Sequence, residues 1–209
     1  MASIGKFFSD AAKLLFMGVG VSDAGTIPRR IDLSKIASAD GWRLRNCSAS
    51  SVEFKGKEAV QFDAREGEGL ALYGDFELFI GKIDLAIAAI KQNAGLVIRA
   101  RSESEYEVVK FEVEADSEAQ RLKLTVRFDG QSAAIELSPR LIDEWLAVRV
   151  VLAQTFTAVF LNNSNTPSLK VPARTSSTSG GMIGFWIGDQ SQALVADLKY
   201  IQSKKRDFE

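Results

Sequence analysis

The chain has 209 residues, of which 46% are hydrophobic, and its 26 basic and 27 acidic side chains leave a formal net charge of -1. This apolar content excludes wholesale disorder, and the balanced charge excludes the strongly basic surface that is typical of nucleic-acid binding. The sequence has no histidine and a single cysteine, Cys47. It therefore excludes histidine-based catalytic triads, intramolecular disulfides and thiolate metal clusters. No apolar run reaches the ~20 residues that a transmembrane helix needs.

The first 30 residues form an apolar segment and a linker ahead of the main domain. Apolar side chains fall on one helical stripe at Ile4, Phe7, Phe8, Ala11, Leu14 and Leu15. This spacing predicts a short amphipathic helix that packs on the domain or, through residues 1–28, on a partner protein. Two alternatives stay open. One is a signal peptide over residues 1–24, which would make the protein secreted or periplasmic rather than cytoplasmic, and the other is a membrane-surface anchor.

Residues 31–203 are predicted to form one all-β domain, a two-sheet antiparallel sandwich of about a dozen strands, followed by a solvated tail at 204–209. Short alternating segments separated by turn residues are typical of this architecture. The expected strands cover residues 41–45, 57–64, 76–91, 95–101, 106–115, 121–128, 131–137, 145–152, 156–161, 181–187 and 193–201. Gly81 is expected to produce a bulge or bend inside the long strand at 76–91.

Three consecutive strands alternate with period two, which predicts one buried and one wet face. The predicted buried positions are Leu96, Ile98, Ala100, Val109, Phe111, Val113, Leu122, Leu124, Val126 and Phe128. The predicted wet face carries most of the charged side chains of these strands. Asp129-Gly130 stands between the third strand and the next one, and this dipeptide predicts a tight hairpin.

The order of these segments resembles the concanavalin A-like lectin and glucanase superfamily, whose members fold as jelly rolls. The resemblance covers about residues 40–202 and rests on the segments FELFIGKIDLAI, GLVIRARSESEYEVVKFEV, EWLAVRVVLAQTFTAVFLNN, GGMIGFWIG and ALVADLKYI. These segments match a pattern of strands rather than a catalytic signature. Lectins, carbohydrate-binding modules, glycoside hydrolases and adhesion modules share this fold, so the resemblance implies carbohydrate only as the commonest ligand.

The wet face and the strand at 181–187 supply the candidate ligand-binding residues. These are Arg99, Arg101, Tyr106, Lys110, Glu112 and Trp186. Aromatic rings offer flat apolar faces on which sugar rings stack, and Trp186 points outward if its two neighbours are in the core. The alternative interpretation is a solvated sheet face with cross-strand ion pairs and tryptophans that pack in the core or at an edge.

The strand Glu112-Val113-Glu114-Ala115-Asp116 places three carboxylates on one face, similar to the Glu-x-Asp-x-Glu strand of family-16 glycoside hydrolases. The order differs here, and the surrounding cations favour ionised carboxylates over the protonated form that a general acid needs. We therefore expect no catalytic residue, no metal site and no cofactor, and the sequence favours a binding module without excluding an enzyme.

Three functions follow in order of preference. The first is a non-catalytic module that binds a glycan or polysaccharide across the polar sheet face. The second is a structural or protein-interaction domain that docks through its N-terminal segment. The third is a glycoside hydrolase that uses the strand carboxylates.

Overall fold

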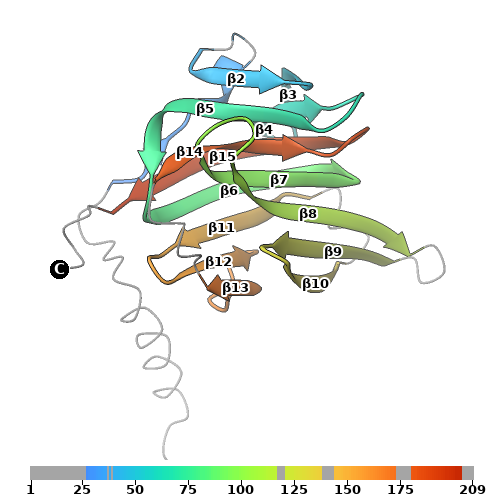
Figure 1. Cartoon of the computed structure of the whole chain (residues 1–209). Coiled ribbons are helices and arrows are strands. Elements are labelled where there is room, and N and C mark those ends of the chain that lie inside the picture. The colour runs from blue at the N-terminus through green and yellow to red at the C-terminus, as the bar shows by residue number, and fades with distance from the viewer. Residues whose placement is uncertain are drawn as a thin grey trace, which may run out of the picture.

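The computed structural model describes residues 27–36, 38, 40–116, 121–137, 144–172 and 180–203, which contain fifteen strands and one short 3-10 helix, η1 (Leu33–Ile36). The strands form two antiparallel sheets packed face to face, so the predicted sandwich is confirmed, with more strands than expected (Figure 1). The predicted N-terminal helix and the tail lie outside the described residues. In the described ranges, no helix has the length and apolar character needed to cross a membrane.

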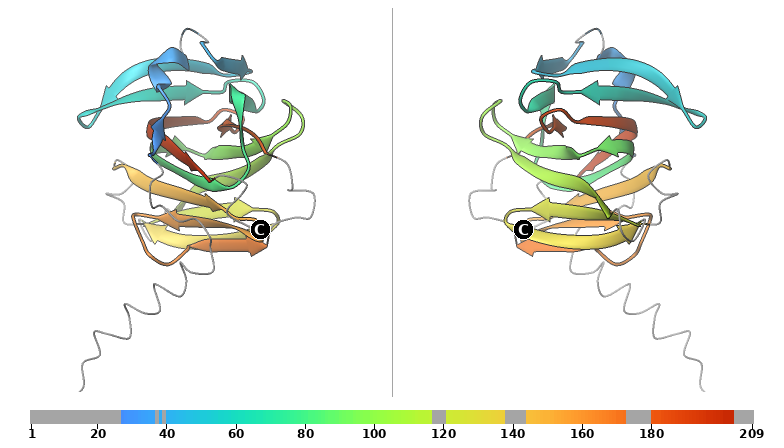
Figure 2. Two further views of the ribbon diagram at one scale, coloured as in Figure 1. Left: turned by 90° about the vertical axis from the view of Figure 1, so that its left-hand side faces the viewer. Right: turned by 90° about the vertical axis from the view of Figure 1, so that its right-hand side faces the viewer.

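The two layers are named sheet A and sheet B and can be followed from both sides in Figure 2. Sheet A has the order β13 (Leu169–Pro172), β12 (Phe156–Leu161), β11 (Leu146–Leu152), β6 (Gly81–Lys91), β15 (Gln192–Gln202), β4 (Lys57–Asp63) and β3 (Ser48–Phe54), with β1 (Arg29–Arg30) paired to β15. Sheet B has the order β10 (Gln131–Leu137), β9 (Arg121–Phe128), β8 (Glu107–Asp116), β7 (Asn93–Ala100), β14 (Gly181–Ile187), β5 (Gly69–Leu78) and β2 (Trp42–Arg45).

The segment at 76–91 belongs to two strands rather than one, which corrects the prediction. β5 ends at Leu78 in sheet B, and β6 begins at Gly81 in sheet A. Gly81 is needed at this crossing because a Cβ atom there would lie 2.0 Å from the carbonyl oxygen of Ile201. The glycine therefore permits a close approach of two backbones where the chain changes sheets, and it does not bulge a continuous strand.

The space between the sheets is filled by apolar side chains that alternation assigned to the buried face. Leu96, Ile98, Val109, Phe111 and Val126 are each at most 1% exposed. Fully burying a side chain of this size contributes about 1.5–3 kcal/mol. This layer therefore holds the two sheets together and fixes which side of sheet B faces outward.

β9 and β10 are joined by the predicted two-residue hairpin, in which Phe128 pairs with Gln131. Asp129 has a φ of 48° and Gly130 a φ of 75°. Positive φ at both central residues is the geometry of a type I′ turn, whose twist matches that of the flanking strands. The turn brings Asp129 and Gln131 to the border of the outer face of sheet B.

A bulge near the end of β7 changes the alternation predicted for residues 95–101. Arg99 has a φ of 50°, and the register between β7 and β14 shifts at this point. As a result, Ala100 lies on the outer face together with Val97, whereas Ile98 stays in the main core. The prediction that Ala100 faces the core is therefore wrong, because a bulge exchanges the faces of the residues that follow it.

Candidate functional site

The outer face of sheet B is apolar over β7, β14 and β5. Its side chains form a cluster separate from the main core, made of Leu70, Leu72, Val97, Ala100 and Trp186, with Tyr106, Val108 and Met182 packed against it. The five central members are at most 4% exposed. Side chains on the outer face of a sheet are buried to this extent only under a cover. Tyr106, Val108, Met182 and the Lys110 ammonium above Trp186 contribute to that cover, and the loop between β7 and β8, residues 101–106, runs beside them (Figure 1).

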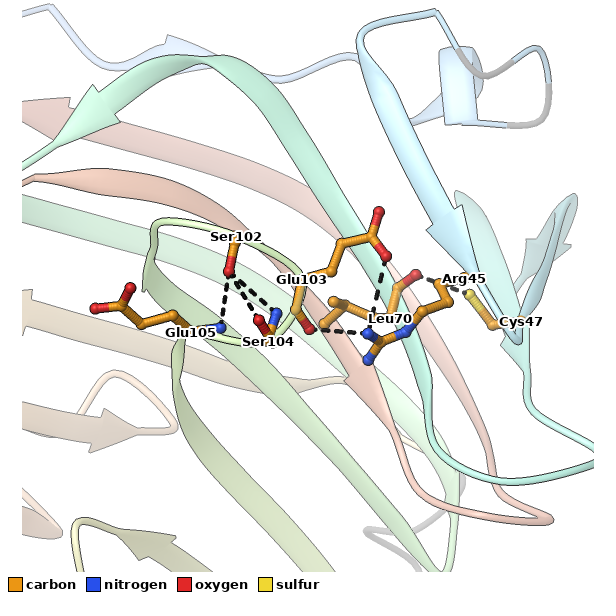
Figure 3. A network of polar contacts seen from close by, with 7 residues as sticks. All are labelled: Arg45, Cys47, Leu70, Ser102, Glu103, Ser104 and Glu105. Atoms are coloured by element: carbon orange, nitrogen blue, oxygen red, sulfur yellow. Dashed lines mark hydrogen bonds and ion pairs between the residues drawn. The ribbon is translucent and has the colours of Figure 1, made fainter.

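The β7–β8 loop is held across the sheet by Arg45 on β2. Arg45 Nη1 donates a hydrogen bond of 2.9 Å to the carbonyl oxygen of Glu103 and lies 3.8 Å from the Glu103 carboxylate (Figure 3). Because β14 and β5 lie between β7 and β2 in the sheet, this contact carries the loop over both strands. Within the loop, Ser102 Oγ accepts hydrogen bonds from the backbone N–H groups of Ser104 and Glu105.

Tryptic cleavage after Arg101 tests the hold on the β7–β8 loop. We expect Arg45→Ala to speed this cleavage severalfold, because removing the guanidinium releases the loop at Glu103. The melting temperature should change little, since exposed ion pairs contribute about 0.2–1 kcal/mol. The rates are measured by mass spectrometry, with Arg43→Ala on the same strand as the matched control. Equal cleavage rates in the two variants would contradict a hold by Arg45.

A hollow of about 320 Å³ opens beside the β7–β8 loop, over β8, β9 and the hairpin turn that follows them. Its lining residues are Tyr106, Glu107, Val108, Lys110, Arg127, Phe128, Asp129, Gly130 and Gln131. Lys110 and Arg127 supply N–H donors, Asp129 supplies carboxylate acceptors, and Gln131 supplies both. The hollow, which we call the sheet B site, therefore offers hydrogen bonds in both directions next to a tyrosine ring.

Trp186 points to the outer face, as its alternation with core neighbours suggests, but it does not lie open. Its Nε1 donates a hydrogen bond of 3.1 Å to Glu68, and its side chain is among the buried members of the outer cluster. The Lys110 ammonium lies 4.1 Å from the indole centroid. Such a cation–π contact orients the lysine. A ligand in the sheet B site would thus contact Lys110, and Trp186 would act indirectly by holding the Lys110 ammonium in place.

Glu112 borders the same face and is held by a cation. Its carboxylate accepts a hydrogen bond from Arg127 Nε across the β8–β9 pair. The register places Lys110 opposite Arg127 and Glu112 opposite Thr125, so the ion pair is diagonal. The Arg127 guanidinium thus occupies the Glu112 carboxylate, whereas glycoside hydrolysis needs a carboxyl group that is free to face the substrate next to a second carboxylate.

Arg99 does not lie with Lys110 and Glu112 on the outer face of sheet B. Its side chain lies between the sheets, 5% exposed, with Nη1 2.9 Å from the Glu107 carboxylate and 3.3 Å from the Thr157 hydroxyl of sheet A. The bulge in β7 accounts for the difference from the predicted wet face. Arg101 lies on the β7–β8 loop, where it pairs with Glu105 at 2.6 Å.

Four of the six predicted ligand residues thus come together at the outer face of sheet B, namely Tyr106, Lys110, Glu112 and Trp186. The predicted set lacked Arg127, Asp129 and Gln131, which also line the hollow. The Asp-Gly hairpin signal could have found them, because a two-residue turn places the ends of both strands beside the site.

The described residues offer little reactive chemistry. In the described ranges, no three carboxylate or cysteine side chains gather in the way that a metal ion needs. The Cys47 thiol donates a hydrogen bond of 3.4 Å to the carbonyl oxygen of Leu70 (Figure 3), and burial raises its pKa. A raised pKa disfavours the thiolate, which is the nucleophilic form.

Comparisons with known proteins agree on the fold. No family model and no curated protein matches the sequence. Among solved structures, a Bacillus subtilis protein of unknown function with a galectin-like fold is similar at a TM-score of 0.56 and 14% identity, over 85% of this chain and 96% of that one. The carbohydrate-binding module CBM66 from Bacillus subtilis is similar at 0.51 and 13%, over 78% and 96%.

An enzyme structure is similar to the same degree. The Crh5 transglycosylase matches at a TM-score of 0.54 and 9% identity, over 85% of each chain. At such identities the likeness concerns the fold alone. The chain has the concanavalin A-like jelly-roll fold, which binding modules and carbohydrate-active enzymes share.

Proposed function

We propose that this domain is a non-catalytic glycan-binding module whose ligand occupies the sheet B site. The observation that carries the proposal is the hollow itself, in which Lys110, Arg127 and Gln131 converge next to the Tyr106 ring. Sugars present hydroxyl groups around a ring with apolar C–H faces. Convergent hydrogen-bonding groups beside an aromatic ring match both features.

The fold supports a carbohydrate ligand, and the chemistry of the site supports binding without catalysis. The similar structures include a module named for carbohydrate binding and a transglycosylase. Beside the sheet B site, the candidate acid Glu112 is bound to Arg127. We therefore expect a polysaccharide to bind without being cleaved, and we keep glycoside hydrolysis as the less favoured function.

A glycan array followed by affinity electrophoresis tests this function. We expect at least one glycan to bind and Lys110→Gln to weaken that binding about tenfold, because the substitution removes a charged donor from the centre of the site. Lys91→Gln, an exposed lysine on sheet A, is the control with the same charge change. The bound glycan should release no reducing ends on incubation.

Two results would contradict the proposal. One is an array on which the full chain binds no carbohydrate. The other is a bound glycan whose affinity Lys110→Gln and Lys91→Gln lower equally, since the ligand would then respond to net charge rather than to the sheet B site.

A further inference from the structure

The outer face of sheet A, on the opposite side of the sandwich, carries a second hollow of about 170 Å³. Part of its floor consists of Ala147 on β11 paired with Ala86 on β6. The next row of residues across these strands has longer side chains. In this row Arg149 lies opposite Asp84, and Asp84 lies opposite Lys199 on β15. Short side chains next to long ones leave a trough that runs across the strands.

Both carboxylates of this trough are already engaged by cations. Asp84 accepts a hydrogen bond of 2.7 Å from Arg149 Nε. Asp197 accepts one of 2.6 Å from Lys57 and one of 3.0 Å from Arg30. The hydrogen bond from Lys57 is the main cause that lowers the pKa of Asp197, so this carboxylate stays ionised at neutral pH.

The cations of the trough outnumber its carboxylates. Lys199 lines the same hollow, is exposed, and makes no ion pair in the described part of the chain. With Lys57 and Arg149, it makes three positive charges in the lining against two negative ones, and Arg30 adds a fourth positive charge beside Asp197. The row spans neighbouring strands that lie about 4.8 Å apart, so these charges are close enough to act on one bound group.

The uncharged residues of the lining determine which kind of anion fits this hollow best. Phe160 and the alanine floor present apolar surface, and Asn163 brings an amide that both donates and accepts hydrogen bonds. A small inorganic anion would interact with the cations and gain nothing from the apolar surface. A sugar that carries a carboxylate would use all three features: its ring faces the apolar floor, its hydroxyls meet the amide, and its charge meets the excess cations.

We propose that this trough, which we call the sheet A site, binds a polysaccharide whose sugars carry carboxylate groups. The proposal does not depend on the sheet B site. The sheets are about 10 Å apart and their outer faces point in opposite directions. A single short glycan therefore cannot fill both sites, and one domain could bridge two chains.

Affinity electrophoresis of the full chain in polygalacturonate tests this site, with the fully methyl-esterified polymer as the neutral form of the same backbone. We expect retardation in polygalacturonate that falls as salt is raised, and none in the methyl ester. Lys199→Glu should weaken the affinity about tenfold, because it reverses a positive charge that lines the trough. Lys91→Glu, near the far end of β6, makes the same change in net charge and should leave the affinity within twofold.

Several outcomes would overturn the sheet A site. These are equal retardation in the methyl ester, equal weakening by Lys199→Glu and Lys91→Glu, or equal binding of polyglutamate, which carries carboxylates without sugars. Loss of polygalacturonate binding in Lys110→Gln with none in Lys199→Glu would assign the acidic glycan to sheet B instead. The array for neutral glycans can fail while Lys199→Glu still changes retardation, so the two proposals are tested separately.

Discussion

Phe111→Ala should lower the free energy of unfolding by about 3 to 5 kcal/mol, because it removes a fully buried ring and leaves a cavity between the sheets. For a chain of this length, a loss of that size lowers the melting temperature by roughly 6 to 20 °C. The measurement is thermal or urea unfolding followed by circular dichroism. A single cooperative transition that moves without changing shape would indicate that the fold survives the substitution.

Glu112→Gln is the matched control, one residue further along β8. Glu112 points to the outer face and pairs with Arg127, whose side chain is half exposed. The substitution keeps the volume of the side chain and removes one exposed ion pair, so it should cost about 0.2 to 1 kcal/mol. A loss for Glu112→Gln as large as that for Phe111→Ala would contradict the exposed position of Glu112, and a reversal of the two losses would mean that β8 is shifted by one residue, since such a slip exchanges the two faces.

Glu107→Ala should destabilise the domain by about 2 to 4 kcal/mol, although it removes only a charged side chain. Arg99 is 5% exposed at its side chain and depends on the Glu107 carboxylate at 2.9 Å. Without that partner the buried guanidinium keeps, among the described residues, only the hydrogen bond of 3.3 Å to the Thr157 hydroxyl, and an uncompensated buried charge is strongly unfavourable. The expected loss lies below the largest values for buried pairs because Glu107 itself is 24% exposed.

Glu105→Ala provides the comparison for this buried pair. It breaks the Arg101–Glu105 pair, which has the same chemistry and side chains that are 46% and 64% exposed. We expect a change of about 0 to 1 kcal/mol there. The double variant Arg99→Met with Glu107→Leu should recover most of the loss, since well-packed apolar side chains replace a buried ion pair at little cost. A Glu107→Ala variant as stable as Glu105→Ala would contradict the buried position of Arg99.

The candidate site could be predicted in part because it lies on regular strands. Lys110 and Glu112 alternate with the core residues Val109 and Phe111, and Tyr106 directly precedes this strand. This period of two is a property of any strand with one buried face. Arg99 was assigned to the same face by the same rule and lies between the sheets. The difference arises from a single bulge, which the local sequence does not reveal and which depends on the pairing of β7 with β14.

The amino-acid sequence by itself determined the all-β class, the core strands and the Asp129-Gly130 hairpin, because alternation and turn residues act over a few neighbouring positions. Only the tertiary structure decided where the chain changes sheets at Gly81, how Arg45 holds the loop at 101–106 across the sheet, and which side chains line the two hollows. These features depend on contacts between residues far apart in the chain. Arg45 reaches Glu103, and Lys57 reaches Asp197, only after both sheets have formed. No short-range pattern encodes such contacts, since each partner by itself is an ordinary surface residue of its own strand or loop.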